Sequence, residues 1–320
     1  MARQDDQVAI KATNLGQNGH RNEKEPSNHR SNICETAPDG GDVATHMFFL
    51  ERDELYDTVK PYVIRYDVKT SVPSENIKRL LCPVTVRDLR VLAEEAPFAQ
   101  SGFQVLSLAS QMSYEDYGDE EKIRTIHVPE VLDIVKANFS ADDVHALEHV
   151  VRRRHPTWPI ATGENYDYEQ PASRAHLDFT YDAVVDIIRH LYEYEAERVL
   201  AGRWQVINVW HPLRGPTRDW PLAVCDAASV DFENDAVPGD IVQIDRVTEN
   251  LQIHFNENQK WFYLSNQMPS EMLVFKNADS ESPHGASCGA PHASFNVFPE
   301  IPKEVRRESI EIRILVMWEG

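Results

Sequence analysis

Short apolar runs separated by turn residues fill the chain from residue 204 onward. Clusters of Pro, Gly, Asn and Asp divide these runs, and each run is strand-like in length and composition. They lie at residues 204–210, 222–225, 240–247, 251–255, 261–264, 272–275 and 309–318. Many short strands at regular spacing are typical of a β-sandwich or a β-barrel.

The preceding part of the chain mixes strand and helix patterns. Its strand-like runs lie at residues 47–50, 62–66 and 102–106. Helices are predicted over residues 129–139, from Ser140 through about Arg154, and over 181–200. Apolar residues recur there at helical spacing, and Ser140 opens a capping sequence. The whole pattern predicts one α+β domain with a β-sandwich core.

Residues 1–45 differ from the rest of the chain because they contain no aromatic residue and are rich in polar residues. Such a segment cannot bury enough apolar surface to offset the entropy lost on ordering. We therefore expect a disordered tail over residues 1–45 and a single domain over residues 46–320. Within that domain we expect an N-terminal α/β part over residues 46–170 and a core mainly over residues 171–320.

The charge and composition exclude several classes of partner. A formal charge of -20, from 52 acidic and 32 basic residues, disfavours binding to nucleic acid and to an anionic membrane surface. No run approaches the roughly 18 apolar residues that span a bilayer, and the first residues lack the apolar segment of a signal peptide. The four cysteines stand singly, which favours reduced thiols. We expect a cytoplasmic protein, either a monomer or a homodimer.

The tripeptide His176-Leu177-Asp178 is the first candidate for chemistry. Residues two apart on a strand face the same side, so this imidazole and this carboxylate can bind one metal ion. A surface His–Asp pair is the simplest explanation of the motif by itself. A second histidine far along the chain makes metal binding by the motif a stronger hypothesis, because two histidines and one carboxylate leave three positions of an iron ion open for a co-substrate and oxygen.

A second candidate region begins at His292 and continues into the last predicted strand. There Arg307, Ser309, Glu311 and Arg313 share one face, and apolar residues share the other. Charged side chains on one face are costly unless they are solvated, paired or bound to a ligand. An arginine followed two residues later by a hydroxyl suits a carboxylate. A solvated edge strand with Glu311 and Arg313 paired is the alternative.

Together, the His-x-Asp motif, the late histidine and the Arg-x-Ser motif resemble the non-heme iron, 2-oxoglutarate-dependent oxygenases. Further segments resemble the branch that contains the fungal gibberellin desaturase and the cephalosporin-methoxylation-type proteins. These segments are residues 204–213, 221–226, Tyr263, Phe275-Lys276, Pro291-His292 and residues 307–313. The resemblance covers roughly residues 47–318. It implies a distorted double-stranded β-helix, or jelly roll, as a core flanked by helices.

The resemblance also implies two cofactors, Fe(II) and 2-oxoglutarate. The implied iron ligands are His176, Asp178 and His292. Arg307, helped by Ser309, would hold the distal carboxylate of 2-oxoglutarate. Arg313 is the alternative, because the interval from His292 to Arg307 is longer than in the common plant-type oxygenases. Asn208 and Trp210 would line the co-substrate pocket, although a structural asparagine and a core tryptophan explain them equally well.

The implied activity is hydroxylation, desaturation or oxidative cyclisation of a small molecule, such as an amino acid or another secondary-metabolite precursor. In this reaction 2-oxoglutarate is decarboxylated to succinate. We expect residues 112–126 and 165–174 to cover the mouth of the site. Their tyrosines and acidic residues would suit a polar or amine-bearing substrate.

Three other interpretations stay open. A zinc peptidase could use the H-x-x-E-H motif on a predicted helix, with a glutamate at position 193, 195 or 197 as a further ligand. Its motif residues are His145, Glu148 and His149. A small zinc site could use His284, Cys288 and His292, although a Gly-Ala-Ser loop gives no rigid scaffold. A jelly-roll protein could also bind a ligand without catalysis. Residues 152–155, which follow the motif, are expected to form a solvated helix end.

Overall fold

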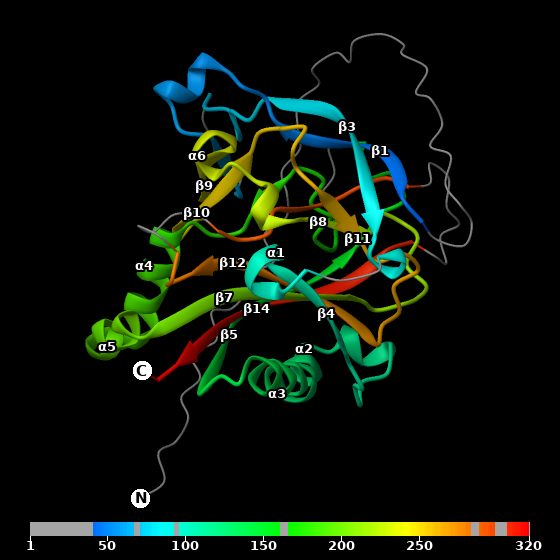
Figure 1. The fold of residues 1–320 in the computed structure, drawn as a ribbon, viewed down its shortest axis with the longest axis vertical. Helices are drawn as coiled ribbons and strands as arrows, with labels where there is room; N and C mark the ends of the chain where they lie inside the picture. Colours follow the sequence, from blue (N-terminus) through cyan, green and yellow to red (C-terminus); the bar gives the residue numbers. More distant parts are fainter. Residues whose placement is uncertain are drawn as a thin grey trace, which may run out of the picture.

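The computed structural model describes residues 41–66, 71–92, 96–160, 166–282, 288–297 and 306–319. Within these residues, nine strands form one sheet and five strands form a second sheet (Figure 1). The chain begins to be described at Gly41, and its first strand begins at Val43, inside the segment expected to be a tail. The rest of that expectation lies outside the described residues.

The nine-stranded sheet curls strongly and is mainly antiparallel; only β3–β11 and β2–β9 pair in parallel. Its strands, in spatial order, are β1 (Val43–Leu50), β3 (Arg79–Asp88), β11 (Trp261–Tyr263), β8 (Leu222–Cys225), β13 (His292–Ser294), β6 (His176–Leu177), β10 (Val247–Ile253), β9 (Ala236–Val242) and β2 (Tyr62–Ile64).

The five-stranded sheet is antiparallel throughout. Its strands, in spatial order, are β4 (Phe103–Ser107), β12 (Glu271–Asp279), β7 (Arg203–Pro212), β14 (Glu308–Trp318) and β5 (Asp143–Arg153). Both sheets combine strands from residues 46–170 with strands from residues 171–320. The two expected parts of the domain therefore interlock.

Helices cover one face and one end of the small sheet (Figure 1). The α-helices are α1 (Phe98–Ser101), α2 (Glu120–Lys122), α3 (Val128–Phe139), α4 (Tyr181–Tyr192), α5 (Ala196–Ala201) and α6 (Phe232–Asp235). Shorter helical turns are η1 (Glu54–Asp57), η2 (Leu89–Val91), η3 (Glu115–Gly118), η4 (Ile123–His127), η5 (Glu193–Glu195) and η6 (Ala227–Ser229). No helix in the described part of the chain is both long and apolar enough to span a membrane.

The two faces of β14 have different partners, as strand alternation requires. Ile310, Ile312 and Ile314 pack with Val131 and Val135 of α3 on the outer face of the small sheet. The opposite face points between the two sheets. There an apolar cluster from both sheets fills part of the interior; it includes Trp210, Leu222, Val224, Leu273 and Phe275.

Several predicted elements are confirmed. Helix α3 matches the helix predicted over residues 129–139, and the helix predicted over 181–200 exists as α4 and α5. These two helices are separated at Glu193, whose φ of 45° is left-handed. The predicted strands from residue 204 onward are present with shifted ends.

The helix predicted from Ser140 to Arg154 is wrong. Ser140, at a φ of 48°, is the C-cap of α3, and the following residues form β5. A β-bulge shifts the register between β5 and β14 at Leu147, because Glu148 pairs with Arg313 and Ala146 with Ile314. Ala146 and Leu147 face opposite sides of the sheet, as neighbours on a strand do, and the bulge changes the alternation after Leu147. Val144, Leu147 and Val151 therefore recur at a spacing that resembles that of a helix.

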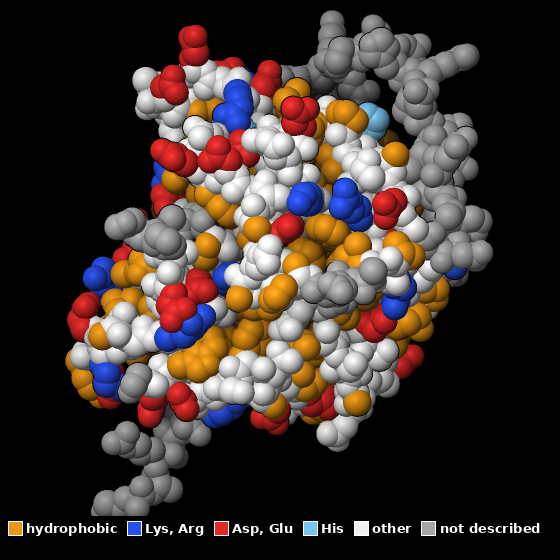
Figure 2. All heavy atoms as spheres, viewed as in Figure 1, with side chains coloured by type: hydrophobic (Ala, Val, Ile, Leu, Met, Phe, Trp, Pro, Cys, Tyr) orange, Lys and Arg blue, Asp and Glu red, His pale blue; other side chains and the backbone are white. Residues whose placement is uncertain are grey.

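Charged side chains of both signs are interspersed with apolar ones over the face shown in Figure 2. No broad basic surface gathers on that face. The view agrees with the net charge of -20 in disfavouring a nucleic-acid surface there.

Two buried histidines join η4 to the outer face of the small sheet. His127 Nε2 lies 3.1 Å from His211 Nε2, and the Tyr117 hydroxyl lies 3.4 Å from His127 Nδ1. Burial lowers the pKa of His127 to about 3 and that of His211 to about 4. Both rings are therefore neutral in the folded protein at neutral pH.

This pair predicts a loss of stability in mild acid. Below about pH 6.5 the unfolded chain binds protons at both histidines and the folded protein does not, so the free energy of unfolding falls as the pH falls toward 4. Each histidine contributes about 1.4 kcal/mol per pH unit to that slope. Urea unfolding of wild type and His127→Leu between pH 4.5 and 6 should give a shallower slope in the variant. Parallel curves would contradict the prediction.

Gly289 lies where β6 and β12 leave no room for a side chain. A Cβ atom at this position would lie 2.2 Å from Leu177 Cδ2 and 2.5 Å from the Lys276 carbonyl oxygen. At Gly118, by contrast, a Cβ atom would meet no atom within 4 Å.

Gly289→Ala should therefore lower the free energy of unfolding by about 3 kcal/mol, because the two strands must move apart. Gly118→Ala is the matched control and should cause no loss of stability. Urea unfolding at pH 7 measures both. Equal midpoints for the two variants would show that the strands do not approach as closely as described.

Candidate metal centre

Three predicted residues meet between the two sheets. His176, Asp178 and His292 each offer one ligand atom, and these atoms lie within 4.8 Å of one another. The Nε2 atoms of His176 and His292 lie 3.5 Å and 3.7 Å from the Asp178 carboxylate oxygens. Two imidazoles and one carboxylate are the donor set that suits Fe(II) with open coordination positions. Among the described residues, this is the one group of three or more such side chains gathered closely enough to hold a metal ion.

Strand alternation places these side chains. Ala175, Leu177 and Ala293 point into the apolar cluster on the far side of the large sheet. Their neighbours His176 and His292 therefore point between the sheets, where they pair with each other across β6 and β13.

Backbone hydrogen bonds set the tautomer of both histidines. Nδ1 of His176 lies 2.8 Å from the carbonyl oxygen of Arg174, and Nδ1 of His292 lies 3.4 Å from that of Ala290. Nδ1–H is thus the donor, and Nε2 presents its lone pair to a metal. Burial and the nearby His176 ring lower the pKa of His292 to about 3, which keeps that lone pair free at neutral pH.

The Asp178 carboxylate is held by a ring of hydrogen bonds that involves two asparagines. Asn208 Nδ2 donates to Asp178 Oδ2 at 2.6 Å, and Asn277 Nδ2 donates to Asn208 Oδ1 at 2.6 Å. The backbone N–H of Asp178 closes the ring by donating to Asn277 Oδ1 at 3.0 Å. The ring fixes the orientation of the carboxylate toward the two histidines.

Arg313 also binds Asp178. Its Nε and Nη2 atoms donate to Asp178 Oδ2 and Oδ1 at 3.0 Å and 2.9 Å, a bidentate contact. Burial raises the pKa of the Asp178 carboxyl, but Arg313 and the neighbouring histidines overcome this and hold it well below its usual value. Asp178 is thus ionised and able to bind a cation.

Two glutamates complete the surroundings of Arg313. Its Nη1 atom donates to Glu148, and its Nη2 atom lies 3.2 Å from Glu311 Oε1. Burial lowers the pKa of Arg313, but Asp178, Glu148 and Glu311 together raise it well above its usual value. Burial, followed by the charge of Asp178, raises the pKa of Glu311. The guanidinium is therefore fully occupied by three carboxylates.

The H-x-x-E-H motif does not form a zinc site. It lies on β5, where Glu148 contacts Arg313 and His149 lies 2.9 Å from Glu120. The His145 ring is 6.4 Å from the ring of Tyr192. The zinc-peptidase interpretation is therefore wrong, because it required one helical face and the three side chains point to three different places.

Arg307 directly precedes β14 and is buried; its backbone N–H donates to Asp219 Oδ2 at 2.7 Å, and the partners of its guanidinium are neutral. Its Nη1 atom donates to the Trp220 carbonyl oxygen at 2.8 Å and to the Ser294 hydroxyl. Its Nε atom donates to Ser309 Oγ at 3.3 Å, and the guanidinium carbon lies 4.9 Å from the Trp210 ring centroid. Burial, and the charge of Arg152, lower the pKa of Arg307 to about 9, so it stays charged at neutral pH.

Other expectations need correction. β14 lies between β7 and β5, so the solvated edge strand is wrong, although Glu311 and Arg313 do pair. Residues 112–126 do not cover the mouth of the site, because Tyr117 and Ile123 pack on the outer face of the small sheet. His284 lies outside the described residues, so the small zinc site with Cys288 stays a prediction.

No sequence motif pointed to Asn277 or to the contact that links Glu148, through Arg313, to Asp178. Asn277 reaches Asp178 only because β12 and β7 pair, and Glu148 only because β5 and β14 pair. No local motif records either contact. The sequence shows polar residues at these two positions, but the residues that they contact are far away along the chain.

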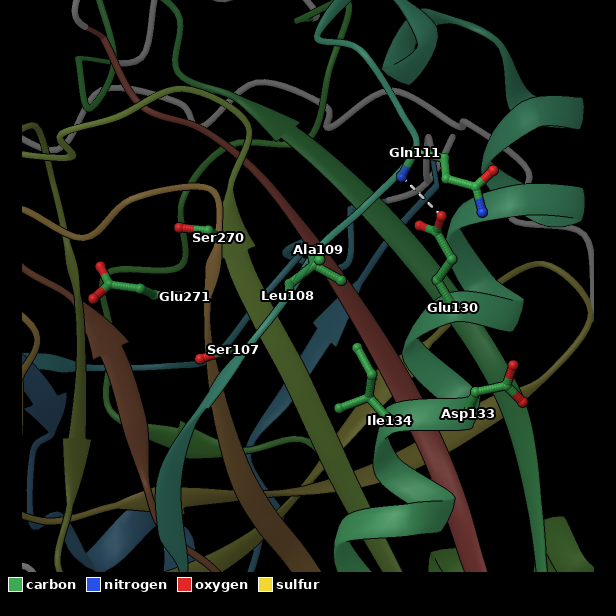
Figure 3. Close-up of a pocket in the computed structure, with 9 residues that line it drawn as sticks. All are labelled: Ser107, Leu108, Ala109, Gln111, Glu130, Asp133, Ile134, Ser270 and Glu271. Atoms are coloured by element: carbon green, nitrogen blue, oxygen red, sulfur yellow. Dashed lines mark hydrogen bonds between the residues drawn. The ribbon is translucent and has the colours of Figure 1, made fainter.

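A separate hollow lies on the outside of the protein, between α3 and the strands β4 and β12 (Figure 3). Glu130 accepts a hydrogen bond from the backbone N–H of Gln111 at 2.8 Å, and Asp133 and Glu271 lie on opposite sides. None of the predicted site residues lines this hollow. It is not part of the metal centre.

The hydrogen-bond ring around Asp178 predicts how strongly the site binds a divalent metal. Asn208→Leu keeps the branched shape of the side chain but removes the donor to Asp178 Oδ2. The affinity for Mn(II), measured by calorimetric titration, should fall about 10- to 100-fold, as for other partners of metal ligands.

Gln259→Leu is the matched control, because Gln259 is buried and its Nε2 atom donates to the His254 carbonyl oxygen, away from the triad. Its Mn(II) affinity should equal that of the wild type. An unchanged affinity in Asn208→Leu would show that the hydrogen-bond ring does not orient Asp178 for metal binding.

Comparisons with known proteins agree with this site. A family profile described as "Oxidoreductase/YMDC permease-like domain" matches residues 47–317. The "Hydroxylase/desaturase efuI" of Hormonema carpetanum is 30% identical over 269 residues, which cover 78% of this chain and 88% of that protein. The "Alpha-ketoglutarate-dependent dioxygenase tstK" of Talaromyces stipitatus is 27% identical over 245 residues, covering 74% and 86%.

The fold has a solved counterpart as well. The "iron and alpha-ketoglutarate-dependent endoperoxidase NvfI" superposes with a TM-score of 0.73 and 27% identity, over 87% of this chain and 98% of that chain. This match confirms the predicted jelly-roll core with flanking helices. The chain belongs to the oxidoreductase family that matches residues 47–317, among the fungal Fe(II)/2-oxoglutarate-dependent dioxygenases.

Proposed function

We propose that His176, Asp178 and His292 bind the Fe(II) of this dioxygenase and that Arg307 binds its 2-oxoglutarate. One observation carries the proposal: a half-buried group of two histidines and one carboxylate lies two strand residues from Ser294, which accepts a hydrogen bond from a buried guanidinium whose hydrogen-bond partners are all neutral. The bound iron and 2-oxoglutarate supply oxygen-dependent oxidation of a small secondary-metabolite precursor, coupled to decarboxylation of 2-oxoglutarate to succinate.

The charge balance favours Arg307 over Arg313 as the residue for the distal carboxylate. Arg313 already contacts Asp178, Glu148 and Glu311, so a further anion would compete with three carboxylates. The Arg307 guanidinium contacts two hydroxyls and one carbonyl oxygen, and among the described residues no carboxylate forms an ion pair with it. A buried charge of this kind is stabilised by an incoming anion.

Ser294 connects the two parts of the site. It follows His292 by two residues on β13, and its hydroxyl accepts a hydrogen bond from Arg307. Two residues of strand span roughly 7 Å. Because the guanidinium contacts Ser294, it lies at about this distance from the proposed metal ligands. This separation suits a five-carbon dicarboxylate that binds the metal at one end and arginine at the other.

Trp210 lies beside this path. Its indole Nε1 atom is buried without a hydrogen-bond partner, as are those of Trp204 and Trp261. Of the three, Trp210 has its ring under the Arg307 guanidinium. We assign Trp210 to the wall of the co-substrate pocket and Asn208 to the support of Asp178.

Apolar side chains keep the site dry. The Phe275 ring lies 4.5 Å from the His292 ring, and Leu222, Val224 and Leu273 belong to the same buried cluster. Excluding water strengthens the electrostatic contacts of bound 2-oxoglutarate and limits side reactions. The protein thus contributes binding, orientation and exclusion of water to the reaction.

The substrate and the type of oxidation are finer proposals. The relatives are named as a hydroxylase/desaturase and an endoperoxidase, and we propose hydroxylation, desaturation or oxidative cyclisation here. An amino acid or another small metabolite precursor is the proposed substrate. We also propose a cytoplasmic monomer or homodimer that binds no nucleic acid or membrane, in keeping with the charge of -20.

The proposal predicts separate effects of the metal and co-substrate residues. His176→Ala should abolish Fe(II)-dependent release of succinate from 2-oxoglutarate. Arg307→Gln should raise the dissociation constant of 2-oxoglutarate for the Mn(II)-loaded protein roughly 100-fold, because a buried charged contact is lost. Calorimetric titration and succinate assay measure the two effects.

Arg189→Gln is the control, because Arg189 forms an exposed ion pair with Glu197 on α4 and α5. It should match the wild type in both assays. A stronger effect of Arg313→Gln than of Arg307→Gln on 2-oxoglutarate affinity, at equal metal affinity, would overturn the assignment of Arg307. Binding of 2-oxoglutarate with no succinate release under any condition would instead indicate a binding protein without catalysis.

A further inference from the structure

Glu311 lies in the middle of β14, on the face that points between the two sheets. Its neighbours Ile310 and Ile312 pack on the outer face of the small sheet, so strand alternation directs Glu311 inward, where it is buried. Its Oε1 atom accepts a hydrogen bond from Arg313 Nη2 at 3.2 Å. The same nitrogen atom donates to Asp178 Oδ1 at 2.9 Å. Because one nitrogen bonds to both, the Glu311 carboxylate lies beside that of the proposed metal ligand.

The strands on either side of β14 show which side chains flank Glu311. β7, β14 and β5 lie side by side (Figure 1), and Glu311 pairs with Trp210 of β7 and with Val150 of β5. Directly paired residues on neighbouring strands share a face of the sheet. An indole, a carboxylate and an isopropyl group therefore form one row across the interior face of the small sheet.

Along β14, this row lies between the two ends of the proposed site. Ser309, two residues before Glu311, accepts a hydrogen bond from Arg307, and Arg313, two residues after it, contacts Asp178. Side chains two residues apart on a strand are separated by roughly 7 Å. The row therefore borders the space in which metal, co-substrate and substrate must meet.

Val150 differs from the other apolar residue of the row. It is half-buried, and it belongs to none of the apolar clusters that the described residues form. Trp210, by contrast, is fully buried in the cluster that includes Phe275. Ligand pockets are lined mainly by apolar side chains with a few placed polar groups. A carboxylate between a packed indole and a valine outside the core matches such a wall.

The second oxygen of Glu311, Oε2, has no hydrogen-bond donor among the described residues. Arg313 divides its bonds among three carboxylates, and Arg152 Nη1 donates to the Gln170 carbonyl oxygen at 2.7 Å. Arg152 lies on β5, so the expectation that it belongs to a solvated helix end is wrong. Oε2 is not one of the unpartnered polar atoms that the protein encloses completely, so a ligand can reach it. A carboxylate oxygen left without a donor in such surroundings is costly.

2-Oxoglutarate cannot supply the missing donor. At neutral pH both of its carboxylates are ionised and its keto oxygen is an acceptor, so the molecule has no N–H or O–H group. Water can bond to Oε2 in the free protein. A substrate that displaces this water must replace its hydrogen bond or lose affinity.

We propose that the substrate is a largely apolar small molecule that presents a hydroxyl or an amino group to Glu311, with Val150 against its apolar part. The inference rests on the proposed function and narrows its substrate class to molecules with a hydrogen-bond donor. It agrees with the polar or amine-bearing substrate expected from the sequence. The selecting residue, however, is Glu311 on β14 and not the tyrosines and acidic residues of segments 112–126 and 165–174. Glu311 binds and orients the substrate and takes no part in its oxidation.

The test uses the whole protein loaded with Mn(II) and saturated with 2-oxoglutarate. Mn(II) enhances the relaxation of nearby protons, so titrations followed by the proton relaxation of a probe report both its affinity and its proximity to the metal. The Zn(II)-loaded protein is the diamagnetic reference. One pair of probes is cyclohexylmethanol and its methyl ether. The other is cyclohexylmethylammonium and its N,N,N-trimethyl analogue, which keeps the charge but has no N–H group. The same two pairs built on adamantane test a larger apolar part.

In at least one pair the probe with the donor should bind roughly 20-fold more tightly than its methylated partner, the value of a hydrogen bond to a charged group. A preference in the first type of pair indicates a hydroxyl substrate, and one in the second type indicates an amine. Glu311→Leu should remove the preference. Glu311→Gln, which keeps a neutral acceptor, should reduce it at least about threefold. Glu121→Leu is the control, because Glu121 forms an exposed ion pair with Arg124, and it should leave every affinity unchanged.

A purely structural role of Glu311 would give a different result. If Glu311 only holds Arg313, Glu311→Leu weakens Mn(II) binding and leaves the preference within each pair unchanged, which overturns the inference. The absence of a preference in all pairs, or a preference for the ether, overturns it as well. If Glu311→Leu does not fold, an unchanged preference in Glu311→Gln has the same consequence. Failure of the wild type to bind Mn(II) or 2-oxoglutarate, titrated first, would instead contradict the proposed function.

Discussion

The burial of one carboxylate, that of Asp178, determines much of the surrounding structure. A buried charge is stable only when it is paired and hydrogen-bonded. Here Arg313 supplies the opposite charge, and Asn208 and Asn277 supply the remaining hydrogen bonds. These partners come from β14, β7 and β12, so the carboxylate joins the large sheet to the small one. The proposed metal ligand is thus oriented by the same contacts that join the two sheets.

Strand alternation allows one pair of sheets to hold both a core and a charged site. On β14, isoleucines pack against α3 while arginine, serine and glutamate face the interior. On β6 and β13, leucine and alanine face one way and the histidines face the other. Each strand therefore contributes to stability with one face and to chemistry with the other. Substitutions on the two faces are expected to have separable effects on folding and on binding.

The sequence predicted the parts of this protein that depend on local pattern. His176 and Asp178 lie two residues apart, and polar and apolar residues alternate along β14. The shared face of His176 and Asp178 and the two different faces of β14 could therefore be predicted. The pairings of Glu148 with Arg313 and of Asn277 with Asn208 depend on strand neighbours that are far apart in the chain. The helix expected over Ser140–Arg154 is wrong because a bulge at Leu147 gives the strand β5 an apolar spacing that resembles that of a helix. Arg152 was expected at the solvated end of that helix and lies instead on β5, for the same reason.

The central claim is that iron and 2-oxoglutarate share one site, between the triad and Arg307. A crystal structure of the protein loaded with Fe(II) and 2-oxoglutarate without oxygen tests it most directly. The account predicts iron bound by His176, Asp178 and His292, with the distal carboxylate of 2-oxoglutarate against Arg307. Iron bound elsewhere, or that carboxylate against Arg313, would contradict it.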